Sequence, residues 1–252
     1  MKRKLILLTA LFLLVPGLVF SDTVSFRVGY FIPRGQSDLW EMEFEQMTFN
    51  KSNYQNTNFC FSYEYFLARQ ISVVIGIDSY SKNKVGNYIG YVGYTFEEGD
   101  FAFPEEYYVG DWVPSHVFSV SITPIQLSLK LTPMGRQDKI IPYVGGGVGL
   151  YIWTVRLQGD MVDFSDEWSF EDPDLGDVPI FPVWPTDARE ENKIAFGYHV
   201  FGGIMIPFAR RITLDAQFKY NRAEGTFKDA FEGFEPFDLG GYQISVGINY
   251  WF

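Results

Sequence analysis

Few side chains in this 252-residue chain have the chemistry of a catalytic nucleophile or base. There are two histidines, His116 and His199, and one cysteine, Cys60. Ser119 follows His116 by three residues, so on a continuous strand the two side chains would lie on opposite faces. No serine-containing motif beside His199 indicates an activated nucleophile. The sequence therefore predicts neither an enzyme active site nor a cofactor.

Carboxylates outnumber every other charged group: 31 acidic residues stand against 20 basic residues, which gives a net charge of −11. Calcium binds carboxylate oxygens, and the densest acidic segment contains Glu171, Asp172, Asp174 and Asp177. Their spacing matches no calcium-binding loop, so we assign no metal site and keep these four as weak calcium candidates. The acidic balance excludes nucleic acid as a partner, because phosphate binding needs a basic surface.

The N-terminal 21 residues have the composition of a secretory signal peptide. A basic stretch at residues 2–4 precedes an apolar run at residues 5–20 that is short for a membrane span. Val19 and Ser21 occupy the positions that a signal peptidase reads before the cleavage point. We expect a signal peptide at residues 1–21 and one domain at residues 22–252.

Alternation of apolar and polar residues is the dominant pattern in the rest of the chain. Successive side chains on a strand point to opposite faces, so such alternation predicts strands with one apolar face. Eight segments show it, at residues 24–32, 59–67, 71–77, 117–131, 143–155, 194–208, 212–220 and 242–252. Within 117–131 the apolar residues change parity at Pro124, and we expect a β-bulge there because proline cannot donate to the ladder.

The connections between these segments alternate between short and long. The short ones are 68–70, 133–141 and 209–211, and the long ones are 34–55, 81–115, 159–193 and 222–240. Bacterial outer-membrane barrels have this arrangement. We predict an all-β fold, an eight-stranded antiparallel transmembrane β-barrel with short periplasmic turns and long extracellular loops, in a bacterial outer membrane. The tyrosine-rich segment 88–96 predicts a hairpin above the membrane, with a ten-stranded barrel as the alternative.

Strand parity places a set of polar side chains inside such a barrel. They are Arg27, Glu64, Asp78, Lys130, His199, Asp215 and Lys219. An eight-stranded barrel is wide enough only to be filled by side chains or to hold one small ligand. An isolated buried charge is costly, so we expect these charges to be paired. A plug of ion pairs and hydrogen bonds is favoured over a polar conduit, although parity alone leaves open whether the lumen is plugged.

Three segments and the C-terminus carry a family resemblance. Residues 27–35 read RVGYFIPRG, 122–129 read ITPIQLSL and 142–149 read PYVGGGVG. Together with SDLW at 37–40, they resemble strands of the outer membrane protein W-like family of small outer-membrane β-barrels. The terminal Trp251 and Phe252 resemble the aromatic assembly signal that the barrel-assembly machinery recognises. The resemblance implies an eight-stranded barrel that passes small hydrophobic solutes laterally toward the membrane.

These observations predict a bacterial outer-membrane β-barrel that acts as a narrow channel or carrier for small hydrophobic solutes. The alternative is a non-transporting surface, adhesion or envelope-stabilising barrel that acts through its acidic extracellular loops. The connection 159–193 alone carries a charge of −9. A lipid A-modifying enzyme is the third possibility. The expected partners are outer-membrane lipid and lipopolysaccharide, the barrel-assembly machinery and a small hydrophobic solute.

Overall fold

The computed structural model describes residues 22–135 and 139–252, so the predicted signal peptide lies outside the described residues. Strands make up most of this part of the chain. The helices are α2 (Asp38–Gln46) and the 3-10 helix η1 (Lys51–Tyr54). Neither of these helices is long and apolar enough to cross a membrane.

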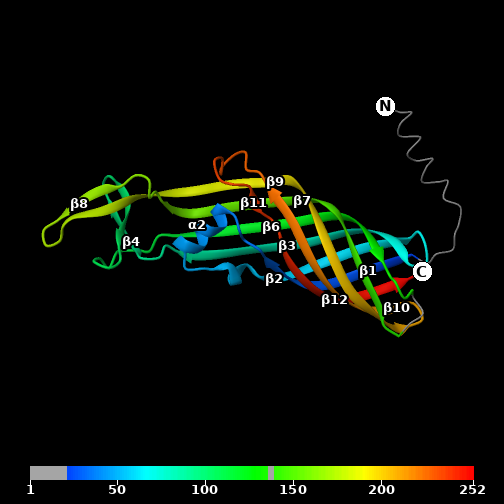
Figure 1. Cartoon of the computed structure of the whole chain (residues 1–252). Helices are drawn as coiled ribbons and strands as arrows, with labels where there is room; N and C mark the ends of the chain where they lie inside the picture. The colour runs from blue at the N-terminus through cyan, green and yellow to red at the C-terminus, as the bar shows by residue number, and fades with distance from the viewer. Residues whose placement is uncertain (1–21, 136–138) are drawn as a thin grey trace, which may run out of the picture.

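Eight strands close into an antiparallel ring (Figure 1). Around the ring they are β1 (Thr23–Pro33), β2 (Asn56–Phe66), β3 (Ile71–Asn87), β6 (Ser115–Leu131), β7 (Ile141–Val162), β9 (Gly176–Ala209), β10 (Ile212–Gly225) and β12 (Gly241–Trp251). β12 pairs with β1 and closes the ring, which leaves the barrel wall without an unpaired edge. The predicted eight-stranded antiparallel barrel is confirmed, and the ten-stranded alternative is wrong.

The outer wall of the barrel is an apolar belt. Outward side chains such as Phe61, Ile75, Leu127, Leu214 and Val246 are exposed on five different strands of the ring. A folded chain exposes so continuous an apolar surface when its surroundings are hydrocarbon. The facing of the strands is therefore that of a membrane-spanning barrel.

The bulge predicted at Pro124 is absent, so that prediction is wrong. β6 pairs with β7 in unbroken register from His116 to Leu131. Phe118, Val120 and Ile122 point inward and are buried. The change in parity instead marks a level in the barrel at which both surfaces exchange character: the interior turns from polar to apolar, and the exterior turns from apolar to polar.

The strands continue far beyond the belt on one side, so the connection predicted at 159–193 is mostly strand. β7 and β9 run on as a long hairpin, with β8 (Trp168–Asp172) paired to β9 near its tip. Val155, Leu157, Val162 and Val183 are buried along this hairpin, which gives it an apolar face. This packing explains why an acidic segment adopts regular structure.

The predicted hairpin around residues 88–96 is present as β4 (Tyr91–Phe96) and β5 (Gly99–Pro104), and β5 pairs with β9 beyond the barrel. We call residues 89–113 and 160–186 the distal extension. Figure 1 shows β4 and β8 together at the end of the molecule remote from the C-terminus.

The mouth of the barrel on that side is closed by α2, β11 (Phe237–Asp238) and an aromatic cluster. Trp40 of α2 packs against Tyr54, Phe118 and Phe237, with ring centroids 5.0, 5.3 and 5.1 Å away. Its indole Nε1 donates to the carbonyl of Asp238 at 3.1 Å. Asp238 also accepts from Arg34 Nε at 2.9 Å. These contacts hold α2 over the barrel as a cap.

The apolar belt makes a direct prediction for Val246, which is exposed at the middle of β12. We expect Val246→Arg to lower the free energy of unfolding in lipid vesicles by about 2–4 kcal/mol, because the charge meets hydrocarbon near the midplane. Ser81→Arg, outward-facing above the belt, is the control and should change stability little. Equal stability of the two variants in reversible unfolding would contradict the assigned facing.

Candidate functional site

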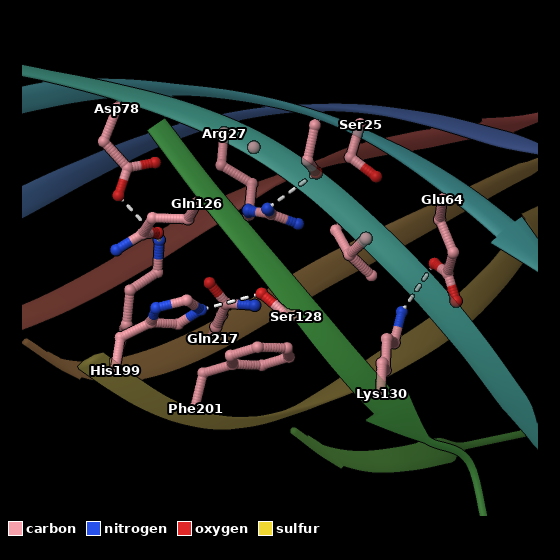
Figure 2. A pocket seen from close by; sticks show the side chains of 14 residues that line it. Ser25, Arg27, Glu64, Asp78, Gln126, Ser128, Lys130, His199, Phe201 and Gln217 are labelled. Carbon is pink, nitrogen blue, oxygen red and sulfur yellow. Dashed lines mark hydrogen bonds and ion pairs between the residues drawn. The ribbon is translucent and has the colours of Figure 1, made fainter. Parts of the chain in front are cut away.

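The seven polar side chains expected in the lumen all lie inside the barrel and are buried. Six of them form three ion pairs: Arg27 with Asp215 at 3.0 Å, Lys130 with Glu64 at 2.8 Å, and Lys219 with Asp78 at 2.6 Å. Figure 2 shows most of this group around one small pocket. Three cations face three anions, so the lumen has no net charge at this level.

The pair between Lys219 and Asp78 crosses the barrel. Lys219 is on β10 and Asp78 is on β3, four strands apart in either direction around the ring. Lys219 Nζ also donates to Gln126 Oε1 of β6 at 2.9 Å. The ammonium group of Lys219 therefore connects β10 with β3 and β6 across the interior of the barrel.

Neutral side chains complete the hydrogen bonding of the buried carboxylates. Tyr143 donates its hydroxyl to Asp215 Oδ1 at 2.6 Å, and Ser72 donates to Glu64 Oε1 at 2.5 Å. The sequence reasoning did not single out Tyr143, Ser72 or Gln126. All three have the inward parity of their strands, so extending the parity argument to neutral polar residues would have found them.

His199, the seventh residue, lies 2.7 Å from Ser128 through its Nε2 atom. Sequence reasoning missed this neighbour, because the two residues are on β9 and β6 with β7 between them. Gly147 of β7 pairs with both of them. Since glycine has no side chain, Ser128 and His199 meet across it. His199 Nδ1 has no hydrogen-bond partner among the described residues.

The lumen is filled by these side chains. The cavity among the ion pairs has a volume of about 20 Å³, and a second one nearer the cap has about 10 Å³. A volume of this size holds about one water molecule. The second cavity is lined by Phe31, Tyr80 and Tyr151, so the interior becomes aromatic toward the cap.

A buried hydrogen bond anchors the cap to the wall. His116 Nε2 of β6 lies 2.8 Å from Glu43 Oε2 of α2, and both side chains are 2% exposed. The His116 ring also packs against Tyr88 at 5.3 Å between ring centroids. Burial raises the pKa of the Tyr88 hydroxyl. His116, the first candidate base in the sequence, thus binds the cap rather than a nucleophile.

The four weak calcium candidates lie at the tip of the β8–β9 hairpin. Asp172 Oδ1 accepts from the backbone N–H groups of Asp174 at 2.9 Å and Leu175 at 3.0 Å, and Oδ2 accepts from the Tyr108 hydroxyl at 2.9 Å. These bonds, the one from Asp174 foremost, lower the pKa of Asp172. Glu171, Asp174 and Asp177 are exposed.

Asp172 therefore stabilises a turn. Across residues 22–135 and 139–252, no group of three or more His, Cys, Asp or Glu side chains is arranged to hold a metal ion.

The distal extension concentrates the charge of the molecule. Residues 89–113 and 160–186 contain 14 acidic residues and no basic residue. The rest of the chain from residue 22 onward is neutral overall. The extension has its own small core of Val92, Phe101, Phe103 and Ile180. It also exposes large aromatic side chains, namely Phe96, Tyr107, Trp168 and Trp184.

The predicted assembly signal ends the last strand of the ring. Trp251 Nε1 donates to Thr213 Oγ1 at 3.2 Å, and Phe252 is exposed beside it. Both lie at the end of the barrel that carries the short turns. Recognition of these residues by the barrel-assembly machinery stays a prediction.

Comparisons with known proteins find similarity in structure only. No protein-family model matches the chain, and no curated protein matches its sequence. The structure is similar to Neisserial surface protein A, NspA, with 12% identity and a TM-score of 0.47 over 92% of this chain and 97% of that chain. It is also similar to the outer membrane protein OprG from Pseudomonas aeruginosa, with 11% identity and a TM-score of 0.47 over 92% and 95% of the two chains.

A third similar structure is Ail, the attachment invasion locus protein of Yersinia pestis. It has 8% identity and a TM-score of 0.41, and the match covers 92% of this chain and 97% of Ail. These neighbours are small outer-membrane β-barrels. At such identities none of their activities transfers to this chain.

Because Lys219 and Asp78 form an ion pair across the lumen, we expect a single substitution to lower the free energy of unfolding more than the double substitution does. Lys219→Met leaves Asp78 as a buried, uncompensated charge and should lower the free energy of unfolding by about 3–5 kcal/mol. Asp78→Asn in the same chain removes that charge, so the double variant should recover much of the loss. Reversible urea unfolding in detergent micelles measures both, and a double variant no more stable than Lys219→Met would contradict the pairing.

The close packing around Gly147 leads to a second prediction. A Cβ atom there would lie 2.0 Å from the carbonyl oxygen of Leu127 and 2.7 Å from Ser128 Cα. Gly147→Ala should therefore cost about 1–3 kcal/mol of stability through overpacking. Gly202→Ala is the matched control, since its Cβ would meet neighbours no closer than 3.6 Å. If both alanine variants melt at the wild-type temperature, the close contact at Gly147 is refuted.

Proposed function

We propose that this chain is a bacterial outer-membrane β-barrel that conducts no solute and presents its distal extension as a binding surface outside the cell. The packed lumen is the observation that carries this proposal. Three ion pairs fill it at mid-height, and aromatic side chains fill it above them. α2 then covers the mouth, anchored by Glu43 and His116.

The form of the extension supports a role in binding. β7 and β9 run without interruption from the barrel wall into the extension, where β4, β5 and β8 widen the sheet. Strands of this length hold a surface at a fixed distance and orientation from the membrane. A connection that only closed the barrel would not need this ordered structure, since a few residues suffice.

The chemistry of the surface favours a cationic partner. Fourteen carboxylates attract basic proteins or peptides over long range. Trp168 and Trp184 offer exposed aromatic faces, which bind arginine side chains through cation–π contacts. Aromatic residues of this kind dominate the energy of protein interfaces. The partner we propose is therefore an arginine- or lysine-rich protein segment.

Other predictions from the sequence remain proposals of lower rank. A channel or carrier for small hydrophobic solutes needs a route around the ion pairs and the cap. Membership of the outer membrane protein W-like family depends on the strand motifs alone. A lipid A-modifying enzyme would need a carboxylate partner for the Ser128–His199 pair, and His199 Nδ1 has none among the described residues.

Conductance tests the closed lumen. The mature protein, refolded into planar bilayers, should show no discrete openings, while a sixteen-stranded porin in the same bilayers conducts. Insertion is verified by the resistance of the barrel to protease. Openings that a small apolar solute blocks would reject the proposal and favour the channel.

Peptide binding tests the surface. We expect a fluorescent arginine-rich peptide to bind the refolded full chain, and a triple variant, Glu167→Gln, Trp168→Ala and Glu171→Gln, to bind about tenfold more weakly. Glu232→Gln with Glu235→Gln, which removes two exposed charges outside the extension, should leave the affinity unchanged. Equal affinity for wild type and triple variant in fluorescence anisotropy would reject the extension as the binding surface.

A further inference from the structure

The β8 strand in the distal extension has one unpaired edge. β8 pairs with β9 along its whole length, from Trp168 opposite Ile180 to Asp172 opposite Gly176. Within residues 22–135 and 139–252, no other strand, isolated β-bridge or backbone–backbone hydrogen bond reaches β8. An exposed edge of this kind is a template to which an extended segment of another chain can add as a strand.

Pro179 of β9 determines which backbone groups lie on that edge. In an antiparallel ladder, opposite residues alternate between pairs that exchange two hydrogen bonds and pairs that exchange none. Ser169 lies opposite Pro179, and proline has no N–H group to donate. The Ser169–Pro179 pair is therefore of the second kind, and so is the pair of Glu171 with Asp177. The N–H and C=O groups of Ser169 and Glu171 consequently point away from β9, onto the unpaired edge.

The two faces of β8 differ in chemistry. Trp168 and Phe170 share the face toward the core of the extension, where the Trp168 ring lies 5.2 Å from the Phe101 ring, measured between centroids. Trp168 is nevertheless 47% exposed. Ser169 and Glu171 are exposed on the other face. A strand added at this edge would therefore have one face beside exposed aromatic carbon and the other beside a carboxylate.

The charge around the edge favours a basic partner over a second copy of this chain. The distal extension contains 14 acidic residues and no basic residue, and Glu167 and Glu171 are exposed beside the unpaired edge. Two β8 strands paired edge to edge would bring these carboxylates together, and like charges on opposite strands are destabilising. A strand with basic side chains instead places cations opposite carboxylates.

We propose that the unpaired edge of β8 binds an extended segment of the partner as an additional strand, and that basic and apolar residues alternate in this segment. The inference rests on the proposed function and specifies its partner. The basic residues of the segment lie opposite Ser169 and Glu171 and pair with their backbone groups. Its apolar residues lie beside Trp168 and Phe170 and extend the core of the extension. Backbone pairing supplies affinity, and the alternation of side chains supplies specificity.

The test compares three versions of a short fluorescent peptide in which arginine and valine alternate, each titrated onto the refolded full chain in detergent micelles. N-methylation removes a backbone N–H group and keeps the side chain and its charge. We expect methylation of the arginines to raise the Kd by about tenfold or more, because their N–H groups face β8. Methylation of the valines, whose N–H groups face away, should leave the Kd unchanged. Fluorescence anisotropy measures all three peptides.

A pair of variants tests the same hydrogen bonds from the protein side. Ser169→Pro removes one N–H group from the unpaired edge and no bond to β9, so it should weaken binding of the unmethylated peptide by about tenfold. Ser169→Ala keeps that N–H group and should bind as wild type does. The methylated peptides need no change in the protein, so they decide the question if Ser169→Pro disturbs the extension.

The outcomes separate this inference from the proposed function. Suppose that the unmethylated peptide binds and that E167Q/W168A/E171Q weakens its binding: equal affinities of the two methylated peptides would then overturn strand addition and leave the extension as the binding surface. If the unmethylated peptide does not bind, or binds wild type and E167Q/W168A/E171Q equally, the inference and the proposed binding surface fail together.

Discussion

Lys219 and Asp78 meet across the full width of the barrel, and the rest of the structure is arranged around that contact. A charge inside a narrow barrel in a membrane has no bulk water to solvate it, so it needs an opposite charge within reach. Pairing opposite walls satisfies this need, in a ring whose diameter is set by the number and stagger of its strands. The remaining two pairs and the neutral donors around them then fill the space that is left.

Glycine on β7 is what makes that interior possible. Lys130 and Ser128 of β6 stand opposite Gly145 and Gly147, and Phe201 and His199 of β9 stand opposite the same two glycines. Because each glycine has no side chain, the larger side chains of its neighbours on β6 and β9 occupy the space in front of it. Size alternation around the wall therefore determines which polar side chains touch: between residues 145 and 149, β7 contributes inward glycines, and larger side chains of β6 and β9 fill the space beside them.

The ring was predictable from sequence because lipid imposes a strict rule on each strand. Phe59, Phe61 and Tyr63 must share one face, and Cys60, Ser62 and Glu64 must share the other, whatever the partner strand is. Inward parity therefore identified Glu64 and Asp78 without a structure. Which cation meets each of them depends on the stagger of the strands around the ring, and parity along one strand contains no information about stagger.

Two features were beyond this reasoning for a physical reason. At Pro124 the alternation was regular, but the polarity of the surroundings reversed, and a single strand cannot distinguish reversed surroundings from a bulge. In residues 159–193 the carboxylates and prolines obscure an alternation that Val162, Val178 and Ile180 still carry on one side. The alternation of apolar and polar residues is weaker in a strand that faces water on one side and a small core on the other than in a strand that faces lipid.

The neutral barrel and the strongly acidic extension have a consequence for how copies of this protein share a surface. Two extensions of equal negative charge repel each other once they come within a few screening lengths, about 8 Å each at physiological ionic strength. The barrels themselves exert no such force, so the repulsion acts only at the height of the tips. The repulsion between extensions thus sets a minimum distance between neighbouring molecules in the membrane. A higher ionic strength of the medium shortens that distance.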